Sequence, residues 1–227
     1  MILGAAAPPS VHPIDLGTSG GRAAYDSSAV GDRRRRRVVV NSSDIADLDQ
    51  RAFVWRDGRR IVLPTLGPTG RYTQSWAAVV NARGDVVGDA SAARGETHAA
   101  LWRNGSPQDL GVLPGGDLSE ADVVADNGDA AGRSKTATGQ HAFLWRHGRL
   151  IDLGPPPPVR GSNDPNVLVN AINESDEIVG STETEFFGHE TRERAFRSLN
   201  GRLVPLLPPS RDSDAVDVNE AGDVAGS

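Results

Sequence analysis

The stretch that decides the fold is residues 141–148, which read His-Ala-Phe-Leu-Trp-Arg-His-Gly. The same pattern occurs at residues 51–58 and 98–105, and a degenerate copy occupies residues 194–201. A second pattern alternates with the first and is best represented by Asn-Ala-Arg-Gly-Asp at residues 81–85. Its copies end at glycines spaced by 44, 48 and 46 residues, namely Gly88, Gly132, Gly180 and Gly226. Because two linked motifs recur at nearly fixed intervals, the sequence predicts a tandem repeat.

Each motif predicts a tight β-hairpin. In the first motif, Asn104-Gly105 separates two short apolar runs, and Asn-Gly pairs favour two-residue type I′ turns. In the second, Gly84 suits a type I turn that ends in a left-handed residue and forms a bulge. Asp176 replaces this glycine in one copy, and aspartate tolerates the left-handed region. One repeat is therefore expected to form four short strands in two hairpins.

Four-stranded units of about 40–50 residues are typical of β-propeller blades, and a single unit cannot bury its apolar face alone. We therefore expect an all-β propeller whose Trp55, Trp102 and Trp145 fill the spaces between neighbouring blades. The domain is expected to span residues 13–227, after a disordered tail or signal remnant at residues 1–12. Its complete repeats are predicted at residues 38–76, 77–120, 121–167 and 168–213.

The two ends of the chain predict a fifth, split blade. Residues 14–17 read Ile-Asp-Leu-Gly and match the last strand of a repeat, as at residues 151–154. Residues 13–17 and 214–227 would then form one closing blade. The first copy is the weakest, because residues 38–47 fit the Asn hairpin only with a deletion and also allow a short helix. An open, truncated array is the alternative to a closed ring.

The composition excludes several classes of protein. The chain has 227 residues, a formal net charge of −6 and no cysteine, so disulfides, thiol nucleophiles and cysteine-ligated metals are excluded. No apolar run is long enough to predict a membrane-spanning helix. The serine-hydrolase elbow, the phosphate-binding loop, the His-Glu-x-x-His zinc motif and the dinucleotide fingerprint are all missing from the sequence. We expect no cofactor and no metal.

The combined repeat, His-Ala-Phe-Leu-Trp-Arg-x-Gly followed by Asp-Leu-Gly and by Asn-x-x-Gly-x-Val-Val-Gly, resembles the bacterial HAF-repeat extracellular protein family. The resemblance covers residues 38–227 and residues 14–17. It implies a secreted or surface-exposed binding or scaffold protein and brings no set of catalytic residues. The chain departs from the pattern where Val62 and Pro205 replace the aspartate of Asp-Leu-Gly. No intact signal peptide is recognisable in residues 1–8.

Any binding site is predicted on the face that carries the long connections, because binding residues concentrate on variable loops held by a rigid scaffold. Trp76 directly precedes a strand and is predicted to be a core residue. Exposed aromatic rings beside carboxylates would suit a sugar, so a lectin-like propeller is one alternative function. A hydrolase with a carboxylate site on this face is another. The candidate ligand-binding residues on this face are Tyr25, Tyr72, Phe186, Phe187, His189 and Glu190.

Recurrent and clustered charges give three weaker hypotheses. Arg51, His98, His141 and Arg194 occupy one slot of the repeat, and a ring of cations at one height would bind an anion. The run of five arginines at residues 33–37 would contact phosphates or form a solvated loop, and the negative net charge favours the loop over nucleic acid. Residues 126–129 are explained better by a turn than by a calcium site. We expect a monomer that binds an unidentified protein or glycan.

Overall fold

The computed structural model describes residues 24–32, 37–44, 50–56, 58–68, 73–159, 165–185, 191–208 and 212–227. At residues 24–32, 37, 42–44, 184–185 and 191 only the backbone is described. Within these ranges the regular elements are all β-strands, and inside each sheet every strand pairs antiparallel with the next strand in the sequence. The expectation of an all-β tandem repeat is confirmed.

The strands form five sheets in chain order, the first four with four strands and the fifth with two. The first sheet contains β1 (Ala24–Asp32), β2 (Arg37–Asp44), β3 (Gln50–Arg56) and β4 (Arg59–Val62). The second contains β5 (Ser75–Val80), β6 (Val86–Ser91), β7 (Thr97–Arg103) and β8 (Ser106–Gly111). The third contains β9 (Ser119–Val124), β10 (Ala130–Thr136), β11 (Gly139–Arg146) and β12 (Arg149–Gly154). The fourth contains β13 (Asn166–Ile172), β14 (Ile178–Glu185), β15 (Thr191–Leu199) and β16 (Arg202–Pro205), and the fifth contains β17 (Ala215–Val218) and β18 (Val224–Gly226).

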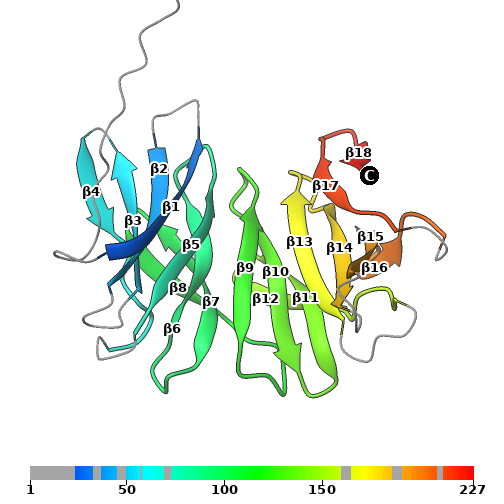
Figure 1. The fold of residues 1–227 in the computed structure, drawn as a ribbon, viewed down its shortest axis with the longest axis horizontal. Coiled ribbons are helices and arrows are strands. Elements are labelled where there is room, and N and C mark those ends of the chain that lie inside the picture. The colour runs from blue at the N-terminus through cyan, green and yellow to red at the C-terminus, as the bar shows by residue number, and fades with distance from the viewer. Residues whose placement is uncertain are drawn as a thin grey trace, which may run out of the picture.

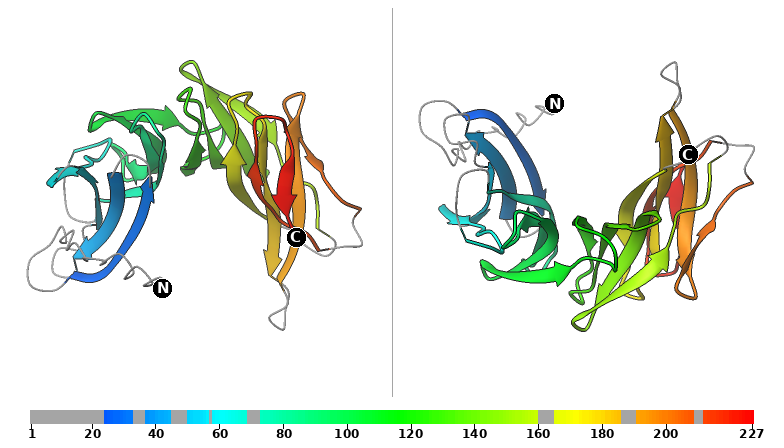
Figure 2. Two further views of the ribbon diagram at one scale, coloured as in Figure 1. Left: turned by 90° about the horizontal axis from the view of Figure 1, so that it is seen from above. Right: turned by 90° about the horizontal axis from the view of Figure 1, so that it is seen from below.

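The sheets follow one another along a curved row (Figure 1). Figure 2 shows the first sheet at one end of this row and the fifth near the other end. The first strands of consecutive sheets contact each other, from β1 to β5, β9, β13 and β17. These strands line the concave, inner side of the row, and the fourth strands lie on its outer side.

Both predicted hairpin turns are confirmed by the backbone angles. The two-residue turns place Asn104 and Gly105 at φ of 52° and 81°, and His147 and Gly148 at 50° and 78°, as a type I′ turn requires. The longer turns place Gly84 at a φ of 92° and Asp176 at 62°. Aspartate therefore takes the left-handed position where the fourth sheet lacks the glycine.

The recurrent asparagine holds its own turn and the next one. The Asn81 Oδ1 accepts hydrogen bonds from the backbone N–H groups of Arg83, Gly84 and Asp85. Its Nδ2 donates to the Ala125 carbonyl, in the equivalent turn of the next sheet, at 2.9 Å. Asn173 does the same toward the Asn219 carbonyl at 2.9 Å. The motif is therefore a connector between sheets as well as a turn.

The residue after this position, which is Ala125 in the third repeat, forms a second series of links. The Asp126 carboxylate accepts a hydrogen bond from the Ala82 N–H at 2.8 Å. Glu174 accepts from the Asp126 N–H at 2.6 Å, and Glu220 accepts from the Glu174 N–H at 3.1 Å. We call this series the turn ladder. It joins the second, third, fourth and fifth sheets along the face that carries the tight hairpins.

The closing glycine of each repeat lies under a bulge in the neighbouring first strand. A Cβ added to Gly132 would lie 2.0 Å from the Glu120 carbonyl oxygen, and one added to Gly88 would lie 1.9 Å from that of Trp76. The strand registers shift at these points, between Ala77 and Val79 in the second sheet. The first sheet has Val40 at the equivalent position, paired with Ala29 in a stretch of continuous register. Glycine is thus required only where the first strand bulges.

The hydrophobic core lies between consecutive sheets. One cluster joins Val39, Val54 and Leu63 of the first sheet to Val86 and Trp102 of the second. Equivalent clusters lie between the second and third, third and fourth, and fourth and fifth sheets. Because strand side chains alternate between two faces, β7 packs Trp102 toward one neighbour and Leu101 toward the other.

The tryptophan slot fills these spaces as expected at Trp102 and Trp145. Trp102 is 1% exposed, and its Nε1 donates to the Pro64 carbonyl of the preceding repeat at 2.8 Å. Trp145 is buried in the next cluster along. Trp55 has the same register, opposite Val38, and is half-buried. In the fourth sheet Ser198 replaces the ring and accepts a hydrogen bond from the Ile178 N–H at 2.9 Å.

The prediction for the first repeat was wrong. It begins with β1 at Ala24 and not at residue 38, and residues 38–44, which were assigned to the Asn hairpin, all belong to the single strand β2. The first hairpin joins β1 to β2 around the arginines 33–36. Asn41 is a strand residue whose side chain bonds to both backbone groups of Ala77 at 2.8 Å. The run of arginines concealed this hairpin, because it has the composition of a solvated loop.

The predicted closing strand at residues 14–17 and the tail at residues 1–12 lie outside the described residues. The described part of the fifth sheet contains β17 and β18 alone. A closed ring of five blades therefore stays a prediction.

We expect Gly132→Ala to lower the free energy of unfolding by about 3 kcal/mol, because the new methyl group would collide with the Glu120 backbone. The measurement is urea denaturation. Gly58→Ala is the control, because its Cβ would meet nothing within 4 Å and costs only the left-handed backbone, about 1 kcal/mol. Equal losses in the two variants would contradict the role given to the bulge.

We expect Trp102→Ala to lower the free energy of unfolding by about 3–5 kcal/mol, because it empties the space between the first two sheets. Trp76→Ala, which removes a ring that is 42% exposed, should cost less than about 1 kcal/mol. Thermal and urea denaturation of both variants provide the comparison. A similar loss for the two tryptophans would show that the core does not lie between the sheets.

Candidate functional site

The loop-face residues predicted to bind a ligand cannot be placed. Tyr72, Phe186, Phe187, His189 and Glu190 lie outside the described residues. Tyr25 belongs to β1, for which only the backbone is described. The loop-face site therefore stays a prediction.

The four residues of the cationic slot share one register and have local partners. His98 and His141 approach the aspartates of their own Asp-Leu-Gly motifs, with Nδ1 to Oδ distances of 2.9 Å to Asp109 and 3.0 Å to Asp152. The Arg51 guanidinium donates to the carbonyl and hydroxyl of Thr73. The Arg194 Nη1 donates to the Pro158 carbonyl at 2.9 Å. These contacts give the slot a structural role, and anion binding by it stays a prediction.

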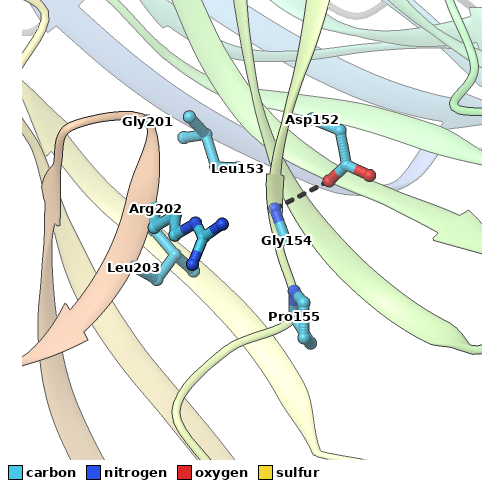
Figure 3. Close-up of a pocket in the computed structure, with 7 residues that line it drawn as sticks. All are labelled: Asp152, Leu153, Gly154, Pro155, Gly201, Arg202 and Leu203. Atoms are coloured by element: carbon cyan, nitrogen blue, oxygen red, sulfur yellow. Dashed lines mark hydrogen bonds between the residues drawn. The ribbon is translucent and has the colours of Figure 1, made fainter.

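A cavity of about 350 Å³ lies on the outer side, between β12 and β16 (Figure 3). Arg202 faces it from one strand and Asp152 lies on the other. Asp152 already accepts a hydrogen bond from the Gly154 N–H at 2.7 Å and contacts His141. The carboxylate of this cavity thus serves the local structure, and the cavity brings few polar groups together.

A second cavity, of about 280 Å³, lies on the inner side of the row and collects side chains from three sheets. We call it the inner cavity. Trp76 and Asp89 lie directly opposite each other on β5 and β6, and Glu120 and Arg133 form the equivalent pair on β9 and β10. The same position of two consecutive repeats therefore builds most of the site. Its lining comprises Gln50, Gln74, Trp76, Ala78, Asp89, Glu120, Ala121, Asp122 and Arg133.

Arg133 organises the third sheet's part of the inner cavity. Its guanidinium forms ion pairs with Glu120 and, at 3.2 Å, with Asp122. All three side chains are about one-fifth to one-quarter exposed. Among the described residues, no ion pair or hydrogen bond is formed by the Asp89 side chain. The cavity thus contains three carboxyl groups and one guanidinium.

Burial perturbs two of these carboxyl groups. It raises the pKa of Asp89 from 3.8 to about 7, with a further increase from Glu120 that Arg133 opposes. It likewise raises the pKa of Asp122 to about 7, although the adjacent Arg133 lowers it. Acidic groups with such shifts, in a cavity, are candidates for a functional role.

The prediction that Trp76 is a core residue was wrong. The ring is 42% exposed and lines the inner cavity. The physical reason is the strand on which it lies: first strands face the concave side with every second residue, so β5 buries Ser75 and Ala77 and exposes the residue between them. The buried tryptophans of the repeat lie on third strands instead.

Sequence reasoning also missed Asp89, Glu120, Asp122 and Arg133. Asp89 and Arg133 directly follow the closing glycines of their repeats. Asn41 and Ser181 hold the equivalent positions of the first and fourth sheets. A position that changes between asparagine, aspartate, arginine and serine in an otherwise regular repeat is the signal from which this site could have been found.

Comparison with known proteins gives no match to a family model, to a curated protein or to a solved structure. Among the described residues, no helix is long and apolar enough to cross a membrane. In the same part of the chain, no three histidine, aspartate or glutamate side chains are grouped to hold a metal ion. The inner cavity is therefore interpreted from its own chemistry.

The raised pKa values of Asp89 and Asp122 predict a pH-dependent stability. Below about pH 4 both groups are protonated in the folded and the unfolded chain, and their contribution to the free energy of unfolding is fully present. As the pH rises toward about 7, the unfolded chain loses these protons first, so the contribution is lost. Asp89→Asn removes one such group, and Asn41 shows that an amide fits the equivalent position.

We therefore expect the stability of Asp89→Asn relative to the original chain to increase between about pH 4 and 7 and to stay constant above pH 8. Thermal denaturation of both proteins across this range measures the difference. A difference in stability that does not change with pH would contradict a raised pKa of Asp89 in the folded chain.

Proposed function

We propose that this protein is a non-enzymatic binding module and that its inner cavity binds a carbohydrate. The observation that carries the proposal is the exposed Trp76 ring beside carboxyl and amide side chains in one cavity. An aromatic ring offers a flat apolar surface against the C–H face of a sugar. Carboxylates accept hydrogen bonds, and amides both donate and accept them, as hydroxyl groups require.

The size and composition of the inner cavity support this proposal. Its volume of about 280 Å³ is at the lower end of small-molecule sites, which suits one or two sugar units. The Gln50 and Gln74 side chains at its edge supply neutral donors and acceptors, and Arg133 supplies a charged donor. The charged groups lie on paired strands, whose fixed backbone limits the conformational entropy lost on binding.

The array itself is proposed to be a five-bladed propeller closed by residues 13–17 and 214–227. Four four-stranded sheets and one hairpin in chain order support this proposal. The resemblance to HAF-repeat proteins adds the proposal that the protein acts outside the cell. Both proposals are independent of the sugar site.

One observation favours a second function, glycoside hydrolysis. A carboxyl group with a pKa of about 7, as for Asp89 and Asp122, can donate a proton near neutral pH. Glu120, paired with Arg133, would be the second carboxyl group, and a pair of carboxyl groups is typical of glycosidases. Release of reducing sugar from a bound oligosaccharide would identify this activity.

We expect Trp76→Ala to weaken oligosaccharide binding at least tenfold, because it removes the flat apolar surface of the site. A glycan array identifies the ligand, and isothermal titration calorimetry measures its affinity. Ile151→Ala is the control, because Ile151 is similarly exposed at 39% but lies on the outer strand β12.

Two results would contradict the inner cavity as the sugar site. One is the absence of binding to any glycan. The other is binding that survives Trp76→Ala and is lost in Tyr72→Ala or Phe186→Ala, which would place the site on the loop face.

A further inference from the structure

The charges that line the inner cavity do not balance. Asp89, Glu120 and Asp122 face it together with one cation, Arg133. Arg133 is occupied by Glu120 and Asp122 of its own sheet. From β5 the cavity receives Trp76 and Ala78, and from the segments before β5 and at the start of β3 it receives two glutamines. Among the described residues, the lining of the cavity therefore contains no second cation.

Asp89 is the carboxyl group that this arrangement leaves without a counter-charge. Asn41, at the equivalent position of the first sheet, uses its amide to bond to both backbone groups of Ala77. A carboxylate at this position can accept from a backbone N–H but cannot donate to a carbonyl. Asp89 lies beside Ala121, the equivalent of Ala77, and both line the cavity. Aspartate thus replaces the residue that a purely structural role would favour.

We infer that the sugar bound in the inner cavity carries a free amine and that its ammonium group pairs with Asp89. This inference rests on the proposed carbohydrate site and names its ligand class as an amino sugar. An ammonium group donates three hydrogen bonds and accepts none, which matches a wall of carboxyl oxygens. Trp76 would contact the apolar face of the same ring.

The acid–base state of the cavity supports the inference. Asp89 is held partly neutral near pH 7 by burial and by Glu120 and Asp122, with Arg133 acting in the opposite direction. A bound ammonium group would favour the ionised form of Asp89 and release its proton. A neutral sugar would bury the carboxyl group further and favour its protonated form.

The test compares β-1,4-linked glucosamine oligomers with their fully N-acetylated counterparts, which differ only in the charge and acetyl group at the amine. Calorimetry at pH 7 should show about tenfold tighter binding of the free amine, the usual gain from a charge-assisted hydrogen bond. Asp89→Asn should bring the two affinities within about twofold of each other. Trp76→Ala should weaken both oligomers to a similar extent.

The outcomes separate the inference from the function on which it rests. Equal affinity for both oligomers, with both weakened by Trp76→Ala, would overturn the amino-sugar inference and leave the carbohydrate site in place. No binding of either oligomer or of any arrayed glycan would overturn both. A lysine peptide that binds as tightly as the amine oligomer, with no effect of Trp76→Ala, would show a cation site without sugar recognition and would also overturn the inference. The comparison of the two oligomers in the unsubstituted protein tests the inference even if neither variant folds.

Discussion

The structure depends on the mutual burial of apolar faces by consecutive sheets. The second, third and fourth sheets each have two such faces, and each buried cluster draws its residues from two neighbouring sheets. No sheet has a core of its own, so cohesion increases with every added copy. Trp102 illustrates this dependence. It fills the space next to the first sheet and donates a hydrogen bond to the Pro64 carbonyl, in the segment that follows the last strand of that sheet.

Local chemistry explains which parts of the fold were predictable. The turns at Asn104-Gly105 and Asp176 were predicted because a positive φ restricts the choice of residue to a few types. The position of each turn determines where its two flanking strands pair, so two hairpins per repeat predicted the four-stranded unit. The first hairpin was missed because its connection is built of arginines, which carry no turn signal. Val40 also replaces the expected glycine there, since the strand beside it has no bulge opposite this residue.

The candidate site was less predictable than the fold for a physical reason. Its members, such as Trp76 and Arg133, come from separate repeats, and only the curvature of the row brings them into one cavity. The sequence shows which residues of a strand point to the same face of its sheet, but it does not show which side of the row of sheets is concave. Trp76 was therefore assigned to the core with the other tryptophans. The pKa shift of Asp89 depends on burial and on Glu120 of the third sheet, and it has no counterpart in the local sequence.

The turn ladder makes the order of the repeats directional. Each acidic side chain accepts a hydrogen bond from the backbone of the copy before it, as Glu174 does from Asp126. A copy can therefore be linked to the one before it in this way only if it brings an acceptor, whereas the copy in front needs no particular side chain. Ala82 has no such acceptor, so the second repeat cannot hold the first in this way. Duplicating the third or fourth repeat would extend the array with every link intact, whereas duplicating the second would create a joint without one.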